Sequence, residues 1–165
     1  MDLTLAKTNE EKDLGVFFSD NFKSTLNCNK SSKAANNVVG MIRRNISSKD
    51  KVGMMILYKS LVRPLLDYCI QVWKPSTKKD MKIMEKIQKR FTKMISGLKD
   101  KSYSQRLNKL GITTLEDRYQ WANMIQVFRV LNDTLGTYPE NFLSLNDRPG
   151  RINSLKLFKG RVGWV

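Results

Sequence analysis

Apolar and basic residues between residues 74 and 98 recur at helical spacing, on opposite sides of the expected helix. At about 100° per residue, the apolar positions form one stripe that packs onto other helices. These positions are Met84, Ile87, Phe91, Met94 and Leu98. The opposite stripe is made of lysines and extends over about 21 Å at 1.5 Å rise per residue. It contains Lys79, Lys82, Lys86, Lys89 and Lys93. The pattern predicts a packed helix with an exposed basic surface.

Two long segments before this helix are also helical in their spacing. From Ser24 onward apolar residues recur every three or four positions up to the polar run at 45–48, so a helix should end there, with Ser48 as the cap of the next one. The segment 50–73 is apolar nearly all round, which predicts a central, buried helix. Pro64 lacks an N–H and crowds the carbonyl four residues earlier, so we expect a kink there.

Turn and cap residues bound the other helices. The turn at 73–77 precedes the basic helix, which Ser76 or Thr77 can cap. A short helix from Ser102 should end at Gly111, because glycine readily adopts positive φ after a helix.

Overlapping capping boxes predict the start of the last helix. Thr113 and Thr114 are each followed three positions later by an acidic residue, Glu116 and Asp117. Apolar periodicity then continues to Leu131, so the last helix should extend to about that residue.

The two ends of the chain differ from this helical middle. Residues 13–18 form a short β-prone run, and the polar segment before it offers no obvious partner, so a single unpaired strand is expected. Residues 134–165 lose the periodicity and should form a weakly structured basic tail. The predicted organisation is a segment at 1–21 with one strand, a helical domain at 22–133 and this tail. The fold class is all-α, a small bundle of four to five helices.

Net charge narrows the classes of function. The 165 residues include 30 Lys and Arg and 15 Asp and Glu, a formal net charge of +15. The excess is concentrated in residues 74–101 and 148–165, as a surface that binds a polyanion requires. Nucleic acid is the favoured partner and an ordinary metabolic enzyme is disfavoured. Aromatic residues near the basic helix, such as Trp73, are interpreted as core residues and not as base-stacking ones.

Cysteine usage and hydropathy favour an intracellular protein, cytoplasmic or nuclear. Cys28 and Cys69 are too few for a zinc site and are interpreted as small apolar residues; whether they pair stays open. Charged residues interrupt the most apolar segment, 52–73, so no membrane span is expected. The first ten residues lack the apolar core of a signal peptide.

Residues suited to catalysis are scarce. The sequence has no histidine, which excludes Ser–His and Cys–His nucleophiles and histidine metal ligands. The acidic residues occupy positions typical of helix caps and ion pairs, and none forms a pair suited to acid–base or two-metal chemistry. The isolated glycines form no phosphate loop. We therefore expect no catalytic residue, no metal site, no cofactor and no small-molecule substrate.

Several runs of residues resemble one family. They are Leu-Tyr-Lys-Ser-Leu-Val-Arg-Pro-Leu-Leu-Asp-Tyr-Cys at 57–69, Trp-Lys-Pro at 73–75, Glu-Lys-Ile-Gln-Lys-Arg at 85–90, Ile-Ser-Gly-Leu at 95–98 and Leu-Glu-Asp-Arg at 115–118. Together they resemble the region that follows the palm domain in reverse transcriptases of non-LTR retrotransposons, especially the LINE-type and jockey-like branch. Leu-Gly-Val at 14–16 resembles the last strand of the palm, near the primer grip.

The resemblance implies the thumb of an RNA-directed DNA polymerase and its C-terminal continuation, which hold the template–primer duplex while the palm performs the chemistry. The family's paired aspartates that bind magnesium have no counterpart in this sequence, which has no two adjacent aspartates. The family's endonuclease is missing as well. We therefore expect a truncated copy that is not catalytic by itself.

The residues and the resemblance together predict sequence-independent binding of an RNA–DNA or DNA duplex, through neutralisation of phosphate charge. The expected binding residues are Lys78, Lys79, Lys82, Lys86, Lys89, Arg90 and Lys93. Two alternatives stay open. One is a decayed open reading frame with no selected activity, whose lysines only keep it soluble. The other is a basic amphipathic helix that binds an acidic partner or a membrane surface. The oligomeric state and the choice between RNA and DNA also stay open.

Overall fold

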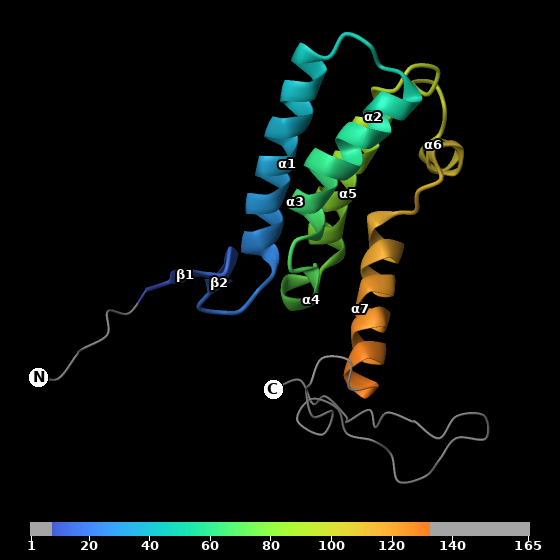
Figure 1. The fold of residues 1–165 in the computed structure, drawn as a ribbon. Coiled ribbons are helices and arrows are strands. Elements are labelled where there is room, and N and C mark those ends of the chain that lie inside the picture. Colours follow the sequence, from blue (N-terminus) through green and yellow to red (C-terminus); the bar gives the residue numbers. More distant parts are fainter. Residues whose placement is uncertain (1–7, 133–165) are drawn as a thin grey trace, which may run out of the picture. The chain divides into compact units, whose positions relative to one another are not determined.

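The computed structural model describes residues 8–132; the predicted tail at 134–165 lies outside them. The chain divides into two compact units, residues 1–122 and 123–165, and the elements below belong to the first, apart from the end of the last helix. The described part is mostly helical with one small two-stranded sheet (Figure 1), so the predicted all-α class is confirmed. None of its helices combines the length and the apolar character needed to cross a membrane.

A β-hairpin replaces the expected unpaired strand. β1 (Glu10–Asp13) pairs antiparallel with β2 (Val16–Ser19), so the prediction of a single strand is wrong. The two residues between the strands have positive φ, 45° at Leu14 and 81° at Gly15, as a tight primed hairpin turn requires. All four β1 residues are exposed. Besides the backbone pairing, Lys12 Nζ of β1 lies 5.5 Å from the centre of the Phe17 ring of β2, and apolar patterning could not predict a strand without a buried residue.

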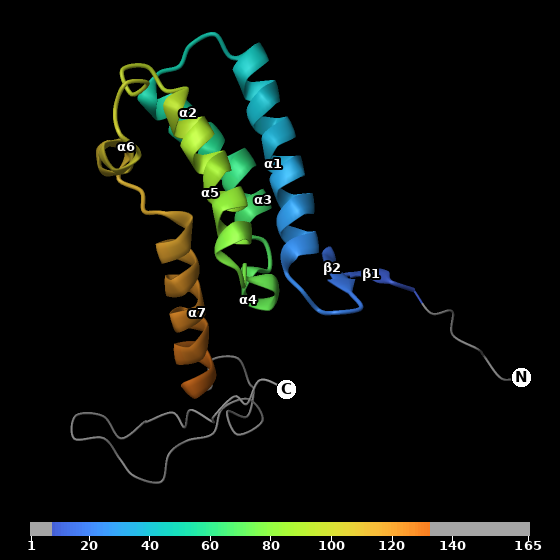
Figure 2. The same cartoon turned by 180° about the vertical axis from the view of Figure 1, so that it is seen from behind.

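The first long helix extends as predicted. α1 (Thr25–Asn45) ends before the extended residue Ile46 and buries Cys28, Ala35, Val39 and Ile42. Figures 1 and 2 show α1 alongside the central helices and α5 (Lys78–Lys93).

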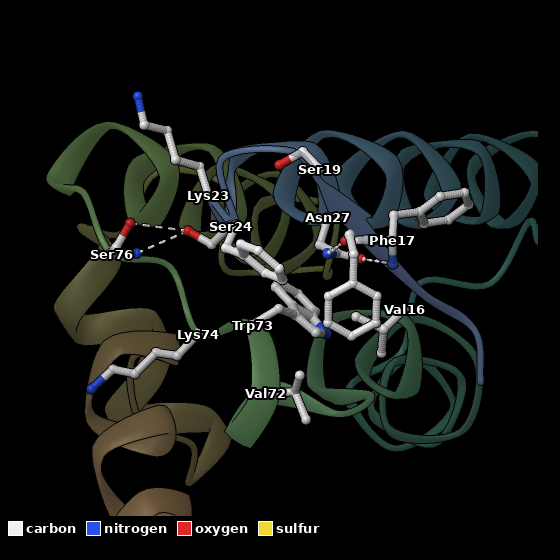
Figure 3. Close-up of a pocket in the computed structure, with 12 residues that line it drawn as sticks. Val16, Phe17, Ser19, Lys23, Ser24, Asn27, Val72, Trp73, Lys74 and Ser76 are labelled. Carbon is white, nitrogen blue, oxygen red and sulfur yellow. Dashed lines mark hydrogen bonds between the residues drawn. The ribbon is translucent and has the colours of Figure 1, made fainter. Parts of the chain in front are cut away.

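Asn27 of α1 holds the hairpin in place. Its Oδ1 accepts the Phe17 N–H at 2.9 Å, and its Nδ2 donates to the Phe17 carbonyl. The amide side chain thereby bonds both backbone groups of one β2 residue, as a neighbouring strand would (Figure 3).

The central segment is helical but divided. It consists of α2 (Lys51–Leu57), a π-helical turn η1 (Tyr58–Val62), α3 (Arg63–Asp67) and α4 (Ile70–Trp73). The π turn ends at Val62, two residues before Pro64, which has no N–H for the usual hydrogen bond to the preceding turn. The expected disturbance at Pro64 is thus a widened turn in place of a simple kink.

The cap of the central segment also differs from the prediction. Asp50, not Ser48, is the N-cap of α2, because Asp50 is extended (ψ 153°) and its carboxylate accepts the Gly53 N–H at 2.7 Å. The Ser48 hydroxyl instead donates to the Asp50 carboxylate at 3.1 Å.

Only one side of the central segment is buried. Its core residues are Met54, Met55, Tyr58, Val62, Leu66, Ile70 and Trp73. On the other side four large apolar side chains are more than half exposed, so the prediction of a helix buried nearly all round is wrong. They are Val52, Ile56, Tyr68 and Val72. The helix breaks at Cys69, which has the left-handed backbone conformation (φ 49°).

The last three helices have the predicted caps. Thr77 caps α5, and its hydroxyl accepts the Asp80 N–H at 3.0 Å. α6 (Tyr103–Leu110) ends at Gly111, which is left-handed with φ 64°. α7 (Leu115–Leu131) begins after Thr114, whose hydroxyl accepts the Asp117 N–H at 3.1 Å. Local sequence signals therefore place these three helices.

Candidate nucleic-acid interface

The basic and apolar sides of α5 are separated as predicted. Met84, Ile87 and Phe91 are buried, and Met94 at the end of the helix is half-buried. The Phe91 ring lies 5.1 Å from that of Tyr58, so α5 packs on the central segment at this point. All seven predicted binding residues are exposed and fall within an arc of about 120° at 100° per residue. They are Lys78, Lys79, Lys82, Lys86, Lys89, Arg90 and Lys93, and we call them the basic face.

Between residues 8 and 132 no carboxylate forms an ion pair with the basic face. Within the described residues the salt bridges join Asp67 to Arg63 and Arg118, and none includes a residue of α5. Of the two acids within α5, Asp80 is buried and accepts from the Thr25 hydroxyl at 3.0 Å, and Glu85 is hydrogen-bonded to α6 and α7. One Glu85 oxygen accepts from the Tyr103 hydroxyl and the other accepts the Leu115 N–H at 3.0 Å. The positive charge of the basic face is therefore available to an external anion.

A buried polar network fixes α5 against its neighbours. Gln88 is 2 % exposed and accepts from the Tyr58 hydroxyl. Its amide nitrogen donates to the Tyr103 hydroxyl at 2.9 Å and to the Thr113 carbonyl at 2.8 Å. Burial raises the pKa of both tyrosines above the ordinary value, Tyr103 also through Glu85, so both hydroxyls keep their protons as donors. The network gives the basic face a rigid support.

Gln88 is not among the residues predicted from the sequence. A signal existed, because Gln88 lies one residue after Ile87 and four after Met84, at the edge of the apolar stripe. The first turn of α5 is held similarly: the Thr25 hydroxyl of α1 donates to the buried Asp80 at 3.0 Å.

Two surface grooves flank the basic face. The first is lined by Lys78, Lys82 and Lys89 together with Tyr103 and two acids, Glu85 and Glu116. The second lies among α1, α5 and α6 and contains no acid. Its polar lining is Asn36, Lys86, Lys89, Arg90, Lys93 and Arg106. The basic face thus borders one groove of mixed charge and one of purely positive charge.

Aromatic side chains near the basic face are engaged within the bundle. Trp73 is 5 % exposed and its Nε1 donates to the Tyr68 carbonyl at 2.7 Å, which confirms its prediction as a core residue. Tyr103 is half-buried, with Lys89 Nζ 5.0 Å from the centre of its ring. Neither ring presents a free face for stacking on a base. The exposed side chains of this surface can therefore bind phosphates, and none of these aromatic rings is available to stack on a base.

A further pocket lies where the hairpin meets α1 and the turn after α4 (Figure 3). Its volume is about 220 Å³, below the roughly 300–1,000 Å³ typical of small-molecule sites. Three of its polar side chains are engaged in the fold: the Ser24 hydroxyl is 3.1 Å from that of Ser76, and Asn27 bonds Phe17. We interpret it as a structural junction.

Metal-ligating residues are dispersed: between residues 8 and 132 no three of them gather closely enough to hold an ion. Cys28 and Cys69 are both free thiols. Cys28 is fully buried in the core and Cys69 packs partly against it, as expected for small apolar residues.

Comparison of the chain with protein-family models, with curated proteins and with solved structures found no match. The resemblance to retrotransposon reverse transcriptases therefore stays a prediction.

Proposed function

We propose that this chain is a non-catalytic nucleic-acid-binding module, a thumb-like fragment of a non-LTR retrotransposon reverse transcriptase that holds duplex through the basic face of α5. One observation supports the proposal above all others. Seven exposed basic side chains share one side of a helix fixed in a packed bundle, and none of them is paired with a carboxylate in the described part of the chain.

The mechanism of binding is charge neutralisation. The lysine stripe of about 21 Å, laid along the duplex axis, covers the rise of roughly six base pairs at 3.4 Å each. Lysine side chains on such a stripe displace condensed counterions from the duplex, and this release drives association without reading sequence. A surface that must hold duplexes of any sequence requires this type of contact.

The packing of α5 argues against a membrane-surface or partner-binding helix. Such a helix needs its apolar side free to insert or dock. In this chain that side is taken up by the core, since Met84 and Phe91 are fully buried and Ile87 is 2 % exposed.

A decayed reading frame predicts a loosely packed core. The core instead contains large, fully buried side chains, and one of them, Tyr119, donates its hydroxyl hydrogen to the Leu66 carbonyl at 2.8 Å. This packing favours a chain that folds and keeps a defined surface.

The test compares two quadruple variants of equal charge. The first replaces Lys82, Lys86, Lys89 and Lys93 by Ala. The second replaces four other lysines by Ala: Lys51, Lys59, Lys99 and Lys109, which are exposed and lie outside the basic face. Fluorescence anisotropy with a short labelled duplex, at one salt concentration, should show most binding lost in the first variant only. Equal losses in both would mean that net charge alone attracts the duplex, and would refute the proposal.

A further inference from the structure

Arg106 is a buried cation without a counter-charge. It lies in α6 and is 7 % exposed. Its Nε donates to the Thr92 hydroxyl at 3.2 Å and its Nη1 donates to the Lys101 carbonyl at 3.0 Å, so both partners are uncharged. Among residues 8–132 no carboxylate oxygen lies within 4.0 Å of its guanidinium. Burying a charge without an opposite charge is unfavourable, and proteins commonly offset it with a bound ion or partner.

The remaining donors of Arg106 are held in position and unused. The Thr92 and Lys101 bonds fix two of its three nitrogens, and its guanidinium carbon lies 5.6 Å from the centre of the Tyr103 ring. The third nitrogen, Nη2, has no hydrogen-bond partner in the described part of the chain. A guanidinium held in this way loses little conformational freedom when it binds an anion, unlike a free surface lysine.

Arg106 lines the purely positive groove among α1, α5 and α6. Arg90 lines the same groove, and its Nη1 donates to Asn36 Oδ1 of α1 at 3.1 Å, which orients a second guanidinium. Lys86, Lys89 and Lys93 complete the charged lining. Two positioned guanidiniums and three lysines therefore border one groove, and a compact, multiply charged oxyanion is the complementary ligand.

We propose that this groove is a phosphate site, in which Arg106 and Arg90 donate hydrogen bonds to one phosphate group and Lys86 and Lys93 add charge. The phosphate would be a phosphodiester group of the bound duplex, so this inference rests on the proposed function. Arg90, Lys86 and Lys93 belong to both the groove and the basic face, and a duplex on the basic face would therefore reach the groove. The site gives the duplex one fixed anchor among otherwise flexible lysine contacts.

The first measurement follows the Arg106 Nε–H resonance of the full chain by NMR. Inorganic phosphate and a short DNA duplex are titrated separately, each against sodium chloride at matched ionic strength. Both phosphate-bearing ligands should shift this resonance saturably, and the duplex at lower concentration, while chloride leaves it in place. A resonance that responds equally to chloride, or that never saturates, would refute the site.

The second measurement uses exposed residues of the groove, so that folding is preserved. Replacing both Arg90 and Lys93 by Ala should weaken phosphate binding about tenfold or more, since each hydrogen bond to a charged group contributes at least about one factor of ten. The matched control, with both Lys51 and Lys59 replaced by Ala, removes the same charge elsewhere and should change phosphate affinity less than about twofold. Equal effects of the two pairs would refute the site.

Arg106→Lys keeps the charge and removes the planar fork, and it should also lose the saturable phosphate response. If this variant unfolds by circular dichroism, the Arg90 and Lys93 pair alone decides the outcome.

The results separate the two proposals. Saturable phosphate binding at Arg106 without duplex binding would refute the proposed function and leave the site. The opposite result is duplex binding that leaves the Arg106 resonance unshifted and is not weakened when Arg90 and Lys93 are replaced. That result would refute the site and leave the proposed function.

Discussion

Glu85 accepts the backbone N–H of Leu115 at 3.0 Å, so a side chain of the basic helix caps the first turn of α7. Its other oxygen accepts from the Tyr103 hydroxyl of α6. Because both oxygens are engaged inside the bundle, Glu85 does not neutralise Lys82 and Lys89, which lie three positions before it and four after it. One acidic residue in the middle of a basic helix thus joins three helices and leaves the basic face positive.

Removing the Glu85 charge should destabilise the chain without weakening duplex binding. Glu85→Gln loses a charge-assisted bond to a helix N-terminus, and we expect the free energy of unfolding to fall by about 1–2 kcal/mol. Urea denaturation measures the change. The matched control is Glu116→Gln, an exposed position in the first turn of α7, which should change stability by less than about 1 kcal/mol. A loss of duplex affinity in Glu85→Gln would contradict this assignment.

Gln88 and Tyr58 should be energetically coupled. Gln88→Leu leaves the Tyr58 hydroxyl and the Thr113 carbonyl without their partner, and each buried group left unpaired costs about 1–3 kcal/mol. Tyr58→Phe removes one of those groups, so the double variant should be destabilised by less than the sum of the two single variants. Urea denaturation of the four proteins gives the coupling, and strictly additive changes would show that the network is not formed.

Duplex binding should weaken steeply with salt. If about five basic side chains contact phosphates, log affinity against log salt should have a slope of about −4 to −5 on duplex DNA. Each single Lys→Ala change on the basic face should reduce the magnitude of that slope by about one. Anisotropy titrations over a series of salt concentrations measure it. A slope near zero would mean that the binding is not made through phosphates.

The two thiols should differ in reactivity. Burial, with a smaller contribution from the nearby Asp80 charge, raises the pKa of Cys28 to about 12. Its thiolate is therefore negligible at about pH 8, whereas the half-buried Cys69 remains open to reagents. Alkylation of the native chain should modify one thiol, and Cys69→Ser should abolish this reaction until denaturant is added. Equal labelling of both native thiols would contradict the packing of Cys28.

Acid should remove the stabilising contribution of Asp50. Its hydrogen bond from the Gly53 N–H, followed by that from the Ser48 hydroxyl, lowers the pKa of Asp50 below its ordinary value of 3.8. A carboxylate with a lowered folded pKa stabilises the fold above its unfolded pKa, and this contribution is lost as pH falls through the folded pKa. Asp50→Asn keeps a capping side chain that does not titrate. The difference in urea midpoint between the native chain and Asp50→Asn should shrink as pH falls below 3.8. A difference independent of pH would contradict the stabilising role of the Asp50 carboxylate.

Sequence reasoning succeeded where neighbours in the chain supply the interaction. Thr77, Gly111 and Thr114 cap or end helices through residues a few positions away, and the sequence shows all of those residues at once. It failed where the partner comes from far along the chain. Arg106 bonds Thr92 and lines a groove with Arg90, and only its spacing with Tyr103 and Leu110, on the buried side of a short helix, hinted at this.

The central segment shows a failure of a different kind. Met54, Tyr58, Val62, Leu66 and Ile70 are all buried, each four residues after the one before. In a regular α-helix each such step advances the side chain about 40° past a full turn, and four steps would move the face by about 160°. The π turn at Tyr58–Val62 and the break at Cys69 keep these residues on one side. An unbroken run of four-residue spacings was therefore the signal of a widened helix.

The π turn has a consequence for how this helix can vary between relatives. The Arg63 N–H bonds the Tyr58 carbonyl, five residues earlier, so this turn holds one residue more than an α-helical turn. Deleting one residue between 58 and 62 would convert it to α-helix and keep the faces before and after it in register. The same deletion would bring the Pro64 ring against the carbonyl of the preceding turn. A relative that is shorter by one residue here is therefore expected to have lost the proline as well, so that chain length and residue identity covary at this position.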